Sequence, residues 1–299
     1  MLPGPILRPS PGPLSTTRLS RRALPLVLTA DHADDVRSVR LDDGNRVGRG
    51  LVEEGPDGPR VRPWGGDVFS TEPRTAEEAT LGLDEVRLLA PVVPSKIVVI
   101  GQNYIDHAAE LGHTEPETLR VFLKAPSSVV GPGEPIVLPE DSGEVHYEAE
   151  LGVIIGRRCR RVTQAEALDC VWGYTCANDV TARDIQRSTG LVSYAKSFDT
   201  FCPLGPWVET DLDPADLRIT CTVNGLVRKD GSTASMVWGV AELVERVSAA
   251  MTLLPGDVVV TGTPAGVGAL AGGDEVSVSI EGIGTLTNPV IGPQAGTQR

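Results

Sequence analysis

The sequence predicts an α/β fold dominated by β-strands, with short helices and a small β-rich region ahead of a larger domain. Short apolar or alternating stretches that end at glycine or at Asn-Gly recur along the 299 residues, and such stretches are typical of strands. The apolar spacing of an amphipathic helix is rarer and is clearest over residues 240–251. The chain shows neither heptads nor internal repeats.

Three segments of the chain differ in composition. Residues 1–35 contain five prolines within the first thirteen positions, then a twin arginine and a short apolar stretch. We expect a disordered extension there, and the alternative is an export signal, which also combines basic and apolar residues. Residues 36–95 should form the small β-rich region, and residues 96–299 should form the larger, catalytic domain.

Local patterns predict the elements in order along the chain. Thr163 and Glu166 have the spacing of a capping box, which opens a helix, and Asn224-Gly225 is a two-residue hairpin turn. Strands are expected at 37–41, 46–52, 97–101, 145–155, 171–177, 258–262 and 275–280, helical stretches at 104–111, from 163, at 181–187 and at 240–251, and a hairpin at 218–228.

Composition excludes several classes of protein. The net charge is −13, whereas a nucleic-acid-binding protein is usually basic. No apolar run approaches the roughly 20 residues that a membrane helix needs. The five cysteines form no CxxC pair, so we expect small buried hydrophobic residues and a reducing cytosol rather than disulfides or a zinc site. An anionic substrate would need local cations in so acidic a protein.

Glu148 and Glu150 are the first candidates for chemistry. Side chains two apart on a strand share a face, and the apolar stretch that follows leads this strand into a core. Two neighbouring carboxylates repel each other unless a cation or a proton lies between them. Oxygen ligands suit Mg²⁺, Mn²⁺ or Ca²⁺. The alternative is a pair of surface glutamates on an edge strand.

Three other motifs carry polar candidates. Asp179 follows the strand at 171–177, at the carboxyl end where ligands often bind, or else it caps a helix. His107 and Glu110 are neighbours on a helix, which suits a general base but also a surface pair. Lys196 stands among apolar residues and could stabilise an oxyanion, or be an ordinary surface lysine. The glycine-rich loop Thr261–Gly268 could offer N–H groups to an anion, or be a plain turn.

Taken together and in this order, the motifs resemble one family. GxNYxxHxxE, Phe122-Leu123-Lys124, HYExELGVIIG, NDVTARDxQ, AKSFDTFCPLGP and TGTPAGVG are similar to the pattern of the fumarylacetoacetate hydrolase family, from about Lys96 to Pro289. The resemblance implies a mixed β-roll or β-sandwich catalytic domain, usually in a homodimer. It also implies a set of site residues, which are Glu148, Glu150 and Asp179 for Mg²⁺ or Mn²⁺ (or Ca²⁺ in a crystal), His107 and Glu110 as the catalytic dyad, and Gln186, Lys196 and Thr263 facing the substrate.

Departures from the pattern indicate the branch of the family. Ile100 stands where fumarylacetoacetases have a further aspartate, and Gln102 stands where many relatives have arginine. The chain therefore resembles the shorter acylpyruvase, 2-hydroxyhepta-2,4-diene-1,7-dioate isomerase and oxaloacetate decarboxylase branch.

Arg183 lies in a motif beside the metal and is expected to help hold an anionic substrate. Its alternative is a structural pairing with Asp184 or Asp179.

The function expected from this resemblance is metal-dependent hydrolysis of a C–C bond in a small 2-oxo or 1,3-dicarbonyl acid, as in aromatic catabolism. His107, oriented by Glu110, would deprotonate a water that attacks the distal carbonyl, while Lys196 holds the oxyanion or carboxylate and the leaving enolate stays on the metal. Acylpyruvate and fumarylpyruvate are the model substrates. The alternatives are a decarboxylase or enol–keto isomerase of a related 2-oxo diacid, or a non-catalytic metal-binding protein of the same fold.

Overall fold

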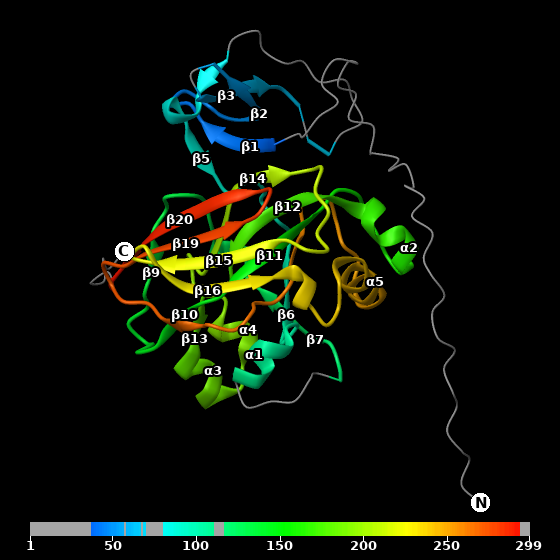
Figure 1. The fold of residues 1–299 in the computed structure, drawn as a ribbon, viewed down its shortest axis with the longest axis vertical. Helices are drawn as coiled ribbons and strands as arrows, with labels where there is room; N and C mark the ends of the chain where they lie inside the picture. Colours follow the sequence, from blue (N-terminus) through cyan, green and yellow to red (C-terminus); the bar gives the residue numbers. More distant parts are fainter. Residues whose placement is uncertain (1–36, 57, 67, 70–79, 111–116, 294–299) are drawn as a thin grey trace, which may run out of the picture.

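The computed structural model describes residues 37–293, apart from 57, 67, 70–79 and 111–116. Within these residues strands far outnumber helices, which confirms the predicted β-dominated α/β class (Figure 1). The disordered extension predicted for 1–35 lies outside the described residues. No helix in the described part of the chain is both long and apolar enough to cross a membrane.

A twelve-stranded sheet forms the centre of the molecule. Its main path runs β4-β3-β2-β1-β14-β12-β11-β17-β6-β7, with β5 pairing β1 and β8 pairing β14. These strands are β1 (Arg37–Asp42), β2 (Val47–Gly55), β3 (Gly58–Trp64), β4 (Leu81–Gly82), β5 (Arg87–Leu89), β6 (Ile97–Gly101), β7 (Arg120–Lys124), β8 (Val129–Val130), β11 (Ala149–Ile155), β12 (Val171–Asn178), β14 (Cys202–Glu209) and β17 (Val258–Val260).

Two smaller sheets complete the β structure. The five-stranded sheet has the order β16-β15-β19-β20-β9, and the three-stranded sheet has the order β13-β10-β18. These strands are β9 (Ile136–Val137), β10 (Val145–Tyr147), β13 (Thr181–Ala182), β15 (Arg218–Val223), β16 (Leu226–Ser232), β18 (Gly268–Ala269), β19 (Glu275–Ile280) and β20 (Gly284–Ile291).

The helices are short, as predicted. Figure 1 shows α1, α3 and α4 at the end of the molecule opposite the N-terminal strands, with α2 and α5 together on one side. Thr163 begins α2 through the predicted capping box, in which its N–H donates to Glu166 at 3.0 Å. The α-helices are α1 (Ile105–Glu110), α2 (Gln164–Ala167), α3 (Arg183–Thr189), α4 (Val192–Ala195) and α5 (Val240–Ala250), and single 3₁₀ turns lie at Leu83–Glu85, Pro126–Ser128, Leu168–Cys170 and Thr233–Ser235.

The N-terminal strands are continuous with the large sheet. Arg37 of β1 lies opposite Glu209 of β14 in antiparallel register, and the Arg37 Nε donates to the Glu209 carboxylate at 3.2 Å. This small β-rich region nevertheless has an apolar cluster of its own, because Val39, Leu41 and Val61 are fully buried together. The predicted β-rich region is therefore confirmed.

The main core lies between the large sheet and the five-stranded sheet. In β19 every second side chain is buried, so Val276, Val278 and Ile280 face the core while the serines between them do not. β11 supplies Leu151 and Val153 from the other side. The described cysteines are all buried and free, which confirms that they act as small hydrophobic residues.

One predicted strand is divided, and the division creates the site. The single strand expected at 145–155 is two strands, because β10 belongs to the three-stranded sheet and β11 to the large sheet, with Glu148 between them. The neighbouring segment that pairs with these strands is interrupted at the matching point, since Asp179 lies between β12 and β13. Pairing resumes on both sides, with Ala149 opposite Asn178 and Val145 opposite Ala182.

A candidate metal centre beside a histidine–glutamate dyad

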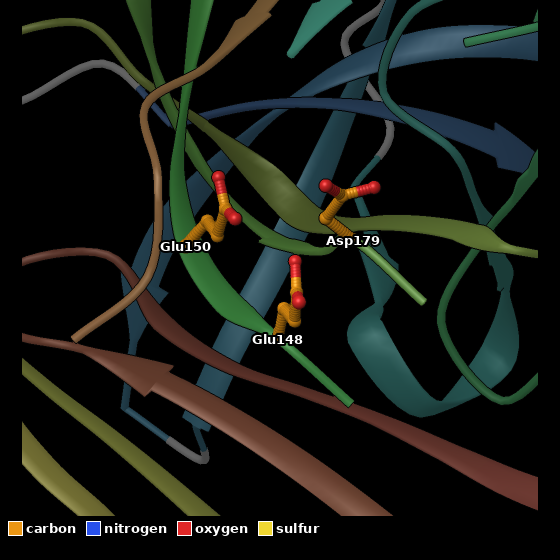
Figure 2. A group of neighbouring side chains, drawn as sticks. All are labelled: Glu148, Glu150 and Asp179. Carbon is orange, nitrogen blue, oxygen red and sulfur yellow. The ribbon is translucent and has the colours of Figure 1, made fainter. Parts of the chain in front are cut away.

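The paired interruption brings three carboxylates together. Glu148 and Asp179 occupy the two interruptions, and Glu150 follows at the start of β11. The side-chain oxygen of Asn178 accepts the N–H of Glu148 at 2.9 Å, and the backbone carbonyl of Glu148 accepts the N–H of Asp179 at 2.9 Å. One ligand oxygen from each carboxylate lies within 4.8 Å of the others, and all three residues are buried (Figure 2).

The three carboxylates have different electrostatic surroundings. Burial, followed by the charges of Asp179 and Glu148, raises the pKa of Glu150 well above its usual value. Glu150 accepts a hydrogen bond from the N–H of Gly262 at 2.6 Å, but among the described residues it contacts no lysine or arginine. Glu148 is the opposite case, because burial would raise its pKa but the charges of Lys196 and Arg183 outweigh it and hold the pKa low.

Three cations surround the other two carboxylates. Lys196 Nζ donates to Glu148 at 2.7 Å, to Thr181 Oγ1 at 2.8 Å and to Asp179. Lys124 pairs with the other oxygen of Asp179. Arg183 pairs with Glu148, so its ion pair is with neither Asp184 nor Asp179. The sequence placed Lys124 in a family motif but gave it no role, because a buried ion pair across 55 residues leaves no local pattern.

The donor set fits a hard divalent cation. All three groups offer oxygen, they are dry and close together, and mutual repulsion already disfavours the ionised form of Glu150. Mg²⁺ and Mn²⁺ prefer such ligands, and a cation would relieve the repulsion. Glu148, Glu150 and Asp179 are therefore the residues that could hold a metal.

The dyad lies on α1. His107 is only 5% exposed, and its Nδ1 lies 3.0 Å from Oε2 of Glu110. A carboxylate at Nδ1 favours the tautomer that carries its proton there, which leaves Nε2 as the basic atom. The charge of a protonated His107 favours ionised Glu148, so the dyad and the carboxylates are close enough to interact.

The glycine-rich loop Thr261–Gly268 connects the two groups. The N–H of Gly262 reaches Glu150, and the N–H of Gly266 reaches the two Glu110 oxygens at 3.0 and 3.2 Å. The anions that this loop binds are thus the protein's own carboxylates. Gly262 has a φ of 96°, and a Cβ there would lie 2.8 Å from the Cβ of Asn103, so both the turn and the close approach require glycine.

The remaining predicted residues lie at the edge of this group. Gln186 Oε1 accepts from Arg183 at 2.5 Å. Thr263 Oγ1 donates to the carbonyl of Ala149 at 2.7 Å and accepts from Lys229 at 2.8 Å. Lys229 is a buried residue of β16 that sequence reasoning missed, because a lysine between Arg228 and Asp230 in a hairpin strand has the sequence pattern of an exposed side chain.

Comparison with known proteins agrees with these observations. The family described as fumarylacetoacetate (FAA) hydrolase C-terminal matches residues 96–291, and the one described as Rv2993c-like, N-terminal, matches residues 36–91. Human mitochondrial oxaloacetate tautomerase FAHD2A is 43% identical over 229 residues, which cover 72% of this chain and 73% of that protein.

Solved structures add two further likenesses. That of 2-hydroxyhepta-2,4-diene-1,7-dioate isomerase from Mycobacterium marinum is 44% identical with a TM-score of 0.79, covering 86% of this chain and 99% of that one. That of fumarylpyruvate hydrolase from Pseudomonas aeruginosa, in complex with Mn²⁺ and pyruvate, is 32% identical with a TM-score of 0.64, covering 69% of this chain and 91% of that one. With its motifs, its fold and its carboxylate cluster in agreement, the chain belongs to the fumarylacetoacetate hydrolase family.

Proposed function

We propose that this protein is a divalent-metal-dependent enzyme that moves a proton between carbon and oxygen in a small 2-oxo acid, as a tautomerase or isomerase. The observation that carries the proposal is the buried carboxylate cluster with a base beside it. Similarity to an oxaloacetate tautomerase and to an isomerase supports this reaction type ahead of the hydrolysis expected from the sequence. The homodimer and the cytosolic location remain predictions.

Glu148, Glu150 and Asp179 would hold Mg²⁺ or Mn²⁺, and a bound cation would act as a Lewis acid toward the two oxygens of a 2-oxo carboxylate. Two observations support Mn²⁺ as the first metal to test. The ligand set contains oxygen alone, and the hydrolase structure holds Mn²⁺ together with pyruvate, itself a 2-oxo acid.

His107 is the proposed base. With Nδ1 held by Glu110, its Nε2 can take a proton from the carbon next to the 2-oxo group and return it elsewhere. The burial of His107 keeps bulk water away from this exchange. Glu110 is held in turn by the N–H of Gly266, so the orientation of the base depends on the glycine-rich loop.

The proposed role of Lys196 is electrostatic. Its three ammonium hydrogens are directed to Glu148, Asp179 and Thr181, so Lys196 acts on a developing oxyanion through its charge. Gln186 and Thr263 are proposed to line the substrate position, together with Arg183, which keeps Glu148 in place.

A second candidate is hydrolysis of a C–C bond, favoured by the likeness to fumarylpyruvate hydrolase. The same base would then take its proton from water, which attacks the distal carbonyl. The two reactions leave different products. Tautomerisation returns an isomer of equal mass, whereas hydrolysis of fumarylpyruvate yields two acids.

The deciding experiment uses the full chain with Mn²⁺, oxaloacetate and fumarylpyruvate in D₂O, followed by proton NMR and enol absorbance. We expect faster enol–keto exchange and deuterium uptake at the carbon next to the 2-oxo group, with both effects lost in His107→Ala. Two new acids from fumarylpyruvate would instead establish hydrolysis. If the rates for both substrates equalled those of a protein-free solution with the same Mn²⁺ concentration, the proposal would be contradicted.

A further inference from the structure

Lys229 is a buried ammonium to which neither the candidate metal site nor the proposed reaction gives a role. It is 2% exposed and belongs to β16, whose neighbouring side chains are largely exposed. Its Nζ donates to Thr263 Oγ1 at 2.8 Å and to the carbonyl of Pro264. Within the described residues no carboxylate lies within ion-pair distance of it, which is unusual for a buried lysine.

Both acceptors of Lys229 belong to the glycine-rich loop. Thr263 and Pro264 lie between the two amides that reach the carboxylates, because Gly262 donates to Glu150 and Gly266 donates to Glu110. The ammonium therefore holds the middle of a segment whose ends contact the metal cluster on one side and the dyad on the other.

The backbone of β16 is shaped for this contact. A Cβ on Gly231 would lie 2.8 Å from the Cβ of Pro264, and a Cβ on Gly266 would lie 2.6 Å from the carbonyl of Arg228. Gly231 on the strand and Gly266 on the loop together let the loop lie directly against the strand. The two hydrogen bonds of Lys229 thus act across an interface that is already tightly packed.

The charge of Lys229 also faces the site. Burial lowers the pKa of Lys229, while the carboxylates of Glu148, Glu150 and Glu110 oppose that effect. A cation at this position is attracted toward the metal cluster and toward the dyad at the same time.

We propose that Lys229 is a positioning residue: it holds the Thr261–Gly268 loop so that the Gly262 and Gly266 amides reach Glu150 and Glu110 together. The loop geometry follows from the contacts alone, and the catalytic consequence rests on the proposed function. Loss of the Lys229 hydrogen bonds should therefore weaken metal binding and misplace the base at the same time, although Lys229 contacts neither the carboxylate cluster nor the dyad.

The test compares Lys229→Met, which keeps length but removes the donors, with Arg218→Met on the adjacent strand β15, where Arg218 makes an exposed ion pair with Asp230. Mn²⁺ affinity is measured by calorimetry, and the Gly262 and Gly266 amides by ¹⁵N NMR. We expect about 10–100-fold weaker Mn²⁺ binding in Lys229→Met, the usual effect of removing a residue that supports a ligand. Both amide signals should shift, and Arg218→Met should match the wild type in both measurements.

A second pair of variants covers the case in which Lys229→Met does not fold. Thr263→Val removes one acceptor of the ammonium, and Thr263→Ser retains it. Thr263→Val should weaken Mn²⁺ binding and move the Gly266 amide, with Thr263→Ser close to the wild type. Wild-type Mn²⁺ affinity with unmoved amides in Lys229→Met, or in Thr263→Val if the first variant is unfolded, would overturn the inference. A wild-type protein that binds no Mn²⁺ would instead refute the proposed function, and the amide signals would still decide the role of Lys229.

Discussion

Within the residues that the structure describes, two places bury a carboxylate beside lysine, and they differ in how the carboxylate is satisfied. Asp257 is fully buried and accepts the N–H groups of Ser95, Lys96 and Leu254, as well as the Ser95 hydroxyl and the Lys96 ammonium. It is a single charge surrounded by donors, most of which come from the backbone. Such an arrangement ties two loops together and leaves no lone pair for a ligand.

The carboxylate cluster is built in the other way. Glu148, Glu150 and Asp179 crowd one another, and Glu150 has a single hydrogen bond and no cation in contact among the described residues. Local donors satisfy Asp257, whereas Glu150 is buried against the charges of Asp179 and Glu148, and a cation bound at the cluster would relieve that repulsion. The difference teaches that repulsion between neighbouring carboxylates, and not burial alone, distinguishes a candidate metal ligand from a structural acid.

Removing the metal should have the largest effect. Treatment with excess chelator should reduce turnover of oxaloacetate to the rate of the protein-free solution, and Mn²⁺ or Mg²⁺ should restore it, because the bound cation would supply the Lewis acid for the 2-oxo carboxylate. Enol absorbance measures both steps. Full activity in excess chelator would contradict the metal role and would make the cluster resemble Asp257 after all.

Replacing the base should have the next largest effect. His107→Ala should lower turnover by about 10²–10⁴-fold, the usual contribution of a general base, while Mn²⁺ affinity stays near the wild-type value. Glu110→Gln should cost less, since Glu110 orients His107. Steady-state kinetics measures the turnover of each variant, and calorimetry on the same preparations measures its Mn²⁺ affinity. Wild-type turnover in His107→Ala would assign the base elsewhere.

Asp257 should behave as a structural residue. Asp257→Asn should lower the free energy of unfolding by about 2–4 kcal/mol, because it breaks a largely buried charge pair and weakens several hydrogen bonds, and it should leave the Mn²⁺ dissociation constant unchanged. Urea unfolding and calorimetry provide the two values. A variant with altered Mn²⁺ affinity and normal stability would remove the distinction between the two carboxylate sites.

The smallest effect concerns Glu150 and pH. Its pKa is raised in the folded protein, so the folded state binds a proton that the unfolded state releases, and metal-free stability should fall as pH rises from the ordinary glutamate pKa toward the folded value. Glu150→Gln removes this loss. At pH 8 without metal the variant should melt about 2–4 °C higher, equal to ~1 kcal/mol for a protein of this size. Identical melting temperatures of the metal-free wild type at pH 5 and pH 8 would contradict the predicted loss of stability with rising pH.

Mn²⁺ affinity of the wild type should rise over the same pH range, because binding must displace the proton of Glu150. Asp257→Asn should show the same pH dependence as the wild type. That control separates protonation of the cluster from general effects of pH on folding.

Local chemistry could be predicted from the sequence, and long-range charge balance could not. Glu148 and Glu150 were predicted from alternation along one strand, Asp179 from the end of another strand, and His107 with Glu110 from helical spacing. Two buried lysines come from distant strands and have no pattern of their own: Lys124, which pairs with Asp179, and Lys229, which contacts the glycine-rich loop.

The fold shows the same limit. Strand positions followed from apolar alternation, as in β15 and β19. The break at Glu148 was missed because alternation continues through it, and only the pairing of each half with a different sheet reveals it. The pairing of β1 with β14 could likewise not be predicted, because the register between strands more than 160 residues apart depends on the assembled core.

The paired interruption at Glu148 and Asp179 has a consequence for how the molecule opens. On one side of it β10 and β13 pair, and on the other side β11 and β12 pair, so the two ladders meet at a seam that few backbone hydrogen bonds cross. An ion bound at the seam would be held by Glu148 and Asp179, which join the two ladders, and by Glu150 of β11. Loading the protein with Mn²⁺ should therefore slow hydrogen–deuterium exchange on both sides of the seam together, including amides well away from any ligand.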